Sequence, residues 1–183
     1  MGKQLVSLDE YKEYSSINST EFDDKIYNII TKTSEFVKNY CNRTFIDNYD
    51  KATSQFTNIV EYSNVPGIFL TAEFPIQSIV SVELSTDSGT TYTSTTGIVD
   101  KSKDVIIIDD TYEGVNAYKV TYKGGFAKTP EDLKLACLDL VDYYYKKESV
   151  PRKTSSNNVI EYVMTSDLPS HIKRVLDIYR VIL

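Results

Sequence analysis

The chain has 183 residues, of which 41% are apolar and 25% are charged, and its formal net charge is −6. These proportions are typical of a folded globular chain and argue against disorder. An acidic surface repels phosphate, so a dedicated nucleic-acid-binding role is disfavoured, although DNA can still pass such a protein. No stretch approaches the roughly 20 apolar residues of a membrane span, and we expect neither a secretory signal nor a membrane contact.

The N-terminal part predicts two helices. Ser7 and Glu10 have the spacing of a capping box, which predicts a short helix ending near Tyr14. A longer helix follows, with a polar cap among residues 18–20, an acidic first turn and apolar residues at steps of three and four. It should end near Cys41, because the next residue is an Asn, which tolerates the left-handed conformation of a helix C-terminus.

Residues 45–126 have a different character, because Thr, Val, Ile, Tyr and Phe occur there in short runs separated by turn residues. The run Val105–Ile108 is continuously apolar, so we expect it to be a central strand. The predicted strands are Gln55–Tyr62, Ile68–Thr71, Ile76–Leu84, Thr90–Thr93, Val105–Asp109 and Tyr118–Tyr122.

The C-terminal part predicts two more helices. Thr129 as a cap, Pro130 in the first helical position and two acidic residues after it indicate a helix that runs to about Lys147. Residues 149–158 are polar and predict a mobile loop, and 159–164 predict a short strand. A last helix should begin at 168–170.

These elements predict an α+β fold. Residues 1–44 and 127–183 would form a helical bundle from the N- and C-terminal helices, and 45–126 would form an inserted antiparallel β-sheet or small β-sandwich.

The residues give little indication of catalysis, and we expect no enzyme, no cofactor and no metal site. His171 is the sole histidine and is interpreted as a surface residue. Cys41 and Cys137 are interpreted as two buried thiols on helices, with a disulfide as the less favoured alternative. One local group of basic residues is interpreted as a solvated helix end and loop: Lys146, Lys147, Arg152 and Lys153. The less favoured alternative is that this group contacts DNA or an acidic protein.

Three motifs and their order carry a resemblance to a known family. Residues 39–45 read Asn-Tyr-Cys-Asn-Arg-Thr-Phe, and residues 73–82 read Glu-Phe-Pro-Ile-Gln-Ser-Ile-Val-Ser-Val. Residues 122–136 join Tyr-Lys-Gly-Gly-Phe to Thr-Pro-Glu-Asp-Leu-Lys-Leu-Ala. In this order they resemble the tailed-phage head–tail connector proteins, also called adaptor or head completion proteins, over nearly the whole chain. The β region is larger than in the smallest members of that family.

The resemblance implies a non-enzymatic, structural subunit of the virion neck, assembled in the host cytoplasm. Such a subunit docks on the portal protein after DNA packaging, forms a homo-oligomeric dodecameric ring, extends the DNA channel and offers a platform for a stopper or tail-completion protein. Double-stranded DNA would pass it without sequence-specific binding, and an acidic channel wall would let that DNA slide.

The resemblance also implies that the C-terminal segment reaches the portal. The candidate portal-binding residues are Leu168, Pro169, Ile172, Val175, Leu176, Tyr179, Val181, Ile182 and Leu183. The alternatives are a non-viral protein–protein interaction module, in which helices flank a β domain, and a small enzyme for which no site can be named.

Overall fold

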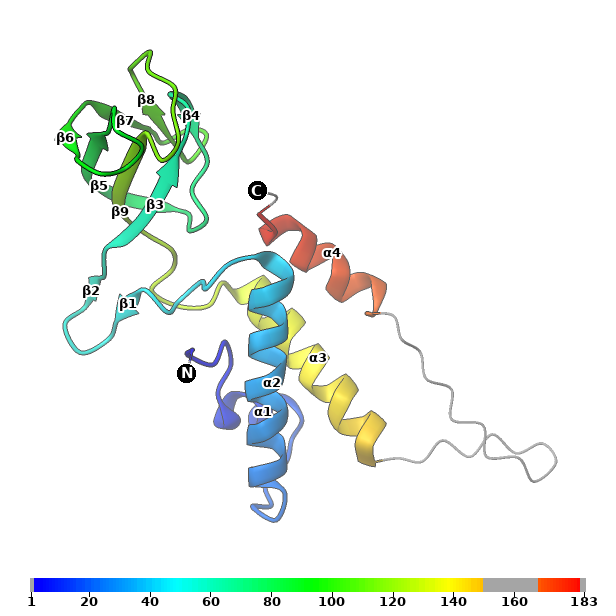
Figure 1. Ribbon diagram of the computed structural model, residues 1–183. Coiled ribbons are helices and arrows are strands. Elements are labelled where there is room, and N and C mark those ends of the chain that lie inside the picture. The colour runs from blue at the N-terminus through cyan, green and yellow to red at the C-terminus, as the bar shows by residue number, and fades with distance from the viewer. Residues whose placement is uncertain (1, 150–167, 182–183) are drawn as a thin grey trace. The chain divides into compact units, whose positions relative to one another are not determined.

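The computed structural model describes residues 2–149 and 168–181 (Figure 1). The chain divides into a helical unit, Met1–Cys41 with Thr129–Arg180, and a β unit, Asn42–Lys128 with Val181–Leu183. Because helices and antiparallel sheets occur in separate segments, the predicted α+β class is confirmed. The predicted strand at 159–164 and all of the predicted loop at 149–158 except Ser149 lie outside the described residues.

The described part of the helical unit contains helices α1 (Leu8–Tyr14), α2 (Asp23–Cys41), α3 (Glu131–Ser149) and α4 (Ser170–Tyr179). The capping box is confirmed: the Ser7 hydroxyl accepts from the Glu10 amide at 3.2 Å, and the Glu10 carboxylate accepts from the Ser7 amide at 2.7 Å. Asn42 follows α2 with φ of 52°, the left-handed conformation that was predicted. No helix in the described residues is long and apolar enough to cross a membrane.

The start of α3 is tied to the N-terminal segment. The Thr129 hydroxyl, predicted as a helix cap, donates to the carbonyl of Leu5 at 2.7 Å. The Pro130 carbonyl accepts from the Lys134 amide at 2.8 Å, so Pro130 stands at the beginning of the helix. The helix continues to Ser149, two residues beyond the predicted end.

The core of the helical unit lies between the helices, and α3 contacts each of the other described helices. Its large, fully buried side chains are Tyr11, Ile26, Ile30, Leu133, Leu140, Ile172 and Leu176. Complete burial of a Leu or Ile side chain stabilises a fold by about 1.5–3 kcal/mol, so these contacts are the main favourable contribution to the packing of the helices.

The described part of the β unit contains three antiparallel sheets, in the orders β1-β2, β3-β9-β5-β6 and β4-β8-β7. The strands are β1 (Tyr49–Asp50), β2 (Gln55–Phe56), β3 (Ile59–Ser63), β4 (Gly67–Phe69), β5 (Ile76–Leu84), β6 (Thr93–Ser94), β7 (Gly97–Asp100), β8 (Val105–Ile108) and β9 (Tyr118–Gly124). The strand β5 has the predicted bounds, and β8 is the central strand of its sheet, as predicted.

Two strand predictions need correction. The predicted strand Gln55–Tyr62 is split into β2 and β3. The interruption lies at Thr57, whose amide donates to the Asn48 carbonyl at 2.7 Å. The predicted strand Thr90–Thr93 is a strand only from Thr93 onward. The amides of the two residues at 90 and 91 donate to the Asp87 carboxylate at 3.0 and 2.8 Å, which holds them in a turn.

The four-stranded and three-stranded sheets share one apolar core. Its fully or nearly fully buried members include Phe69, Val82, Ile106, Ile108, Tyr118, Val120 and Tyr122. Close approach of β7 to β5 requires Gly97, because a Cβ atom there would collide with the Val82 side chain.

Candidate functional site

The three motifs meet in one cluster of the β unit, the Arg43 hub, formed by the buried residues Arg43, Phe45 and Glu73 and the half-buried Phe74 and Phe126. The Arg43 guanidinium lies 3.5 Å from the ring centroid of Phe74, and 4.9 and 5.4 Å from those of Phe45 and Phe126. Its side chain is fully buried, and its Nη2 donates to the Phe74 carbonyl. A cation that is desolvated over aromatic faces gains about 2 kcal/mol or more from them, so the rings form a specific seat for this charge.

The Glu73 carboxylate is the negative partner in the hub. Its Oε2 lies 3.7 Å from Arg43 Nη2, and its side chain is only 5% exposed. It also accepts from the Thr44 amide, from the Thr44 hydroxyl at 2.7 Å and from the Phe45 amide at 3.2 Å. Because a buried ion pair is tolerated only when its lone pairs are also satisfied, these backbone bonds explain how the charge stays in the interior.

A second polar pair adjoins the hub. The Tyr122 hydroxyl donates to the Glu61 carboxylate and accepts from the Glu73 amide at 3.1 Å. Burial raises the pKa of Glu61, against the opposing effects of the bonds from Tyr122 and from the Ala72 amide. Burial, and then the Glu61 carboxylate, raise the pKa of Tyr122. Burial thus disfavours the charged form of each group, and the pair is a structural hydrogen bond in the interior.

The glycine pair of the third motif allows the chain to pass close to the hub. Gly125 has φ of 95°, and a Cβ atom there would lie 2.6 Å from the Phe45 carbonyl oxygen. The next residue, Phe126, donates its amide to that same oxygen at 2.9 Å. The hub thus joins the segment that enters the β unit to the segment that leaves it. Its charges are engaged and buried, so Arg43 and Glu73 maintain the fold and are not available to a ligand.

The candidate portal-binding residues of the C-terminal segment lie in several environments. Ile172 and Leu176 are buried in the helical unit, and Val181 is also buried. Leu168, Pro169, Val175 and Tyr179 are half-buried, and Ile182 and Leu183 lie outside the described residues. The outer side of α4 instead presents Arg174 and Ile178, and Ile178 is 72% exposed.

Tyrosine–aspartate hydrogen bonds, which were not predicted from the sequence, connect different helices of the helical unit. They join Tyr11 to Asp142 (3.3 Å), Tyr14 to Asp139 (2.5 Å), Tyr40 to Asp177 (2.6 Å) and Tyr179 to Asp132 (2.7 Å). Burial raises the pKa of Tyr11 to about 12, and the hydrogen bond to Asp139 raises that of Tyr14 to about 12. The high tyrosine content could have pointed to these bonds only if the helix contacts had been known.

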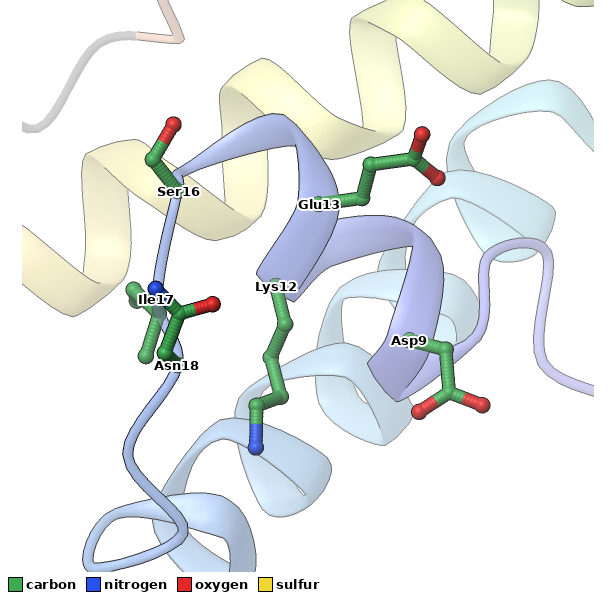
Figure 2. A pocket seen from close by; sticks show the side chains of 6 residues that line it. All are labelled: Asp9, Lys12, Glu13, Ser16, Ile17 and Asn18. Atoms are coloured by element: carbon green, nitrogen blue, oxygen red, sulfur yellow. The ribbon is translucent and has the colours of Figure 1, made fainter.

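A hollow of about 510 Å³ lies beside α1 and the segment after it (Figure 2). It is lined by Asp9, Lys12, Glu13, Ser16, Ile17 and Asn18. The Lys12 ammonium is paired with Asp23 at 2.8 Å. In Figure 2 the carboxylates of Asp9 and Glu13 point away from the Lys12 ammonium. No set of groups converges there on a common point, so the hollow lacks the arrangement of a catalytic site.

The remaining chemical candidates have structural surroundings. His171 is exposed, as predicted, with Nε2 at 3.7 Å from Asp139. Both cysteines are buried, as predicted; burial raises the pKa of the Cys137 thiol to about 12, so the reactive thiolate is strongly disfavoured there. The described residues contain no group of three or more His, Cys, Asp or Glu that would hold a metal ion.

The basic cluster is only partly described. Lys146 pairs with Asp142 at 2.7 Å on the surface of α3. Arg152 and Lys153 lie outside the described residues, and so does the side chain of Lys147.

Comparison with known proteins gives three findings. The family described as "Head completion protein" matches residues 4–182. The head completion protein of Escherichia phage T5 is 37% identical over 59 residues, which are 32% of this chain and 35% of that protein, so the match spans about a third of its length. A solved chain from the "Neck of empty GTA particle computed with C6 symmetry" has the same fold, with a TM-score of 0.56, 11% identity, and coverage of 98% of this chain and 91% of that one.

Proposed function

This chain belongs to the head completion protein family, which makes it a component of a head–tail connector, and we propose that it is a ring-forming adaptor that docks on the portal protein after DNA packaging. The single observation that carries this proposal is the family match over residues 4–182. The solved neck chain supports it, because the shared fold extends over both units.

The proposed role is structural and not catalytic. The ion pair of the Arg43 hub, between Arg43 and Glu73, is buried and is held in place by hydrogen bonds. A buried ion pair that keeps the fold fixed suits a protein whose role is to occupy a defined place in an assembly. In this role the protein would reside in the virion neck, after assembly in the host cytoplasm.

We propose a dodecameric ring that extends the DNA channel and carries a stopper or tail-completion protein. A ring of twelve copies retains sixfold symmetry, which agrees with the symmetry named for the neck that contains the similar chain. A net charge of −6 per copy would give the ring an acidic character, so passing DNA would meet repulsion and would not adhere.

Residues 168–183 are the proposed portal contact. In this arrangement the buried Ile172 and Leu176 pack α4 against the other helices of the same chain. The outer side of α4, with Ile178 and Arg174, contacts the portal. The contact then needs no separation of the helix from its core.

The test is to mix the purified chain with the portal protein of the same genome and to image the mixture by negative-stain electron microscopy. We expect an added ring of density at the narrow end of the portal. Bare portals at a high excess of the chain would contradict the portal-binding role.

A further inference from the structure

Three isoleucines form a row across the outer face of the sheet β4-β8-β7. The strand register pairs Ile68 with Ile107 and Ile107 with Ile98. Their exposed fractions are 65%, 37% and 58%. We call these three residues the apolar row; Figure 1 shows its strands together in the β unit.

The apolar row departs from the usual pattern of an antiparallel sheet, which has one apolar face and one polar face. The inner face of this sheet is already used, because Phe69 and Ile106 belong to the core of the β unit. The continuously apolar β8 has a sequence suited to burial on both faces, but on the face that holds Val105 and Ile107 only Val105 is buried. Leu70, directly after β4, is 56% exposed and adds to the apolar surface. Contiguous exposed apolar patches commonly mark interaction sites.

We propose that the apolar row is a contact surface for a second copy of this chain, the neighbour in the connector ring. The inference rests on the proposed function, because it takes the chain to assemble in several copies. Each copy carries a net charge of −6, so identical copies repel one another over most of their surfaces. A surface whose side chains carry no charge is where that repulsion is weakest and apolar burial is gained.

The size of the apolar row agrees with a ring contact. Stable pairwise interfaces bury about 1,200–2,000 Å², far more than three isoleucines supply. The row alone would therefore not hold two copies together in solution, but it can contribute when the portal has already placed the copies side by side. In a closed ring the contact is heterologous, so the row of one copy meets a different surface of the next.

The test uses the full-length chain bound to its portal protein. A photo-crosslinking amino acid replaces Ile98 in one variant and Val115 in the control, which is 62% exposed and lies in the β unit outside the apolar row. We expect the probe at 98 to give covalent dimers of this chain, identified by mass spectrometry, and the probe at 115 to give none. Crosslinks from 98 only to another protein, or none at all on occupied portals, would overturn the inference and leave the proposed function intact.

A matched pair of charge substitutions measures the effect on assembly. Ile98→Lys should reduce the number of chains bound per portal about tenfold or more, because it places a charge in an apolar contact. Val115→Lys adds the same charge at a similar exposure and should leave occupancy unchanged. Equal occupancy for the two variants, with equal unfolding midpoints, would contradict the contact. Failure of the unmodified chain to bind would instead refute the proposed function.

Discussion

At the scale of single residues, the buried charges of Arg43 and Glu73 stabilise the β unit as a pair, because each charge would be buried without its counter-charge if the other were removed. The sequence identified Arg43, Phe45 and Phe126 as motif residues, but it did not predict that three aromatic rings and Glu73 surround the guanidinium. Glu73, Phe74 and Phe126 lie far from Arg43 along the chain, and caps or strand patterns carry no information about such long-range contacts. The hub therefore became visible only in three dimensions.

Arg43→Ala should lower the free energy of unfolding by about 3–5 kcal/mol, because it leaves the Glu73 carboxylate buried without its cation. Urea unfolding followed by circular dichroism measures the loss. The control is Lys119→Ala, which removes a partly exposed pair with Glu83 (2.9 Å) and should cost about 0–1 kcal/mol. Similar losses in the two variants would show that the Arg43 pair has no special weight.

The raised pKa of Tyr11 predicts that the free energy of unfolding falls at alkaline pH. Its pKa in the folded chain is raised to about 12 from 10.0, so its contribution is fully present below pH 10 and disappears as the pH rises through 12. The unfolding midpoint of the chain should thus fall more steeply over this range than that of Tyr11→Phe, which has no ionisable hydroxyl. Tyr27→Phe, at an exposed position, is the control and should follow the unmodified chain. Parallel curves for the chain and Tyr11→Phe would refute this account.

At the scale of elements, the sequence predicted best where local chemistry decides the structure. The capping box of α1, the left-handed Asn42 and the bounds of β5 follow from local signals, and all three were confirmed. The short strands β1 and β7 were missed, because a strand of two to four residues is defined by its partner and not by its own composition.

The two sides of α4 should respond differently to truncation. Leu176→Ala should destabilise the chain by about 2–5 kcal/mol, because the side chain is fully buried. Ile178→Ala should stay within about 0.5 kcal/mol, since the residue is 72% exposed, but should weaken binding to the portal. Thermal unfolding and portal co-sedimentation separate the two effects. Unchanged portal binding by Ile178→Ala would remove the outer side of α4 from the proposed contact.

At the scale of the whole molecule, the net charge of −6 governs the encounter with DNA. We expect the purified chain to leave the electrophoretic mobility of a double-stranded DNA fragment unchanged even at about 50 mM salt, where electrostatic binding is strongest. A basic DNA-binding protein of similar size serves as the positive control. A shift that weakens as salt increases would indicate phosphate contacts and contradict the proposed sliding surface.

The path of the chain through the Arg43 hub has an evolutionary consequence. The excursion that begins at Phe45 returns to it at Phe126, where an amide and a carbonyl meet at 2.9 Å. An insertion whose two ends are neighbours can be shortened, enlarged or exchanged without redirecting the chain that precedes and follows it. Lineages could therefore remodel the β unit for new neighbours while inheriting the helices unchanged.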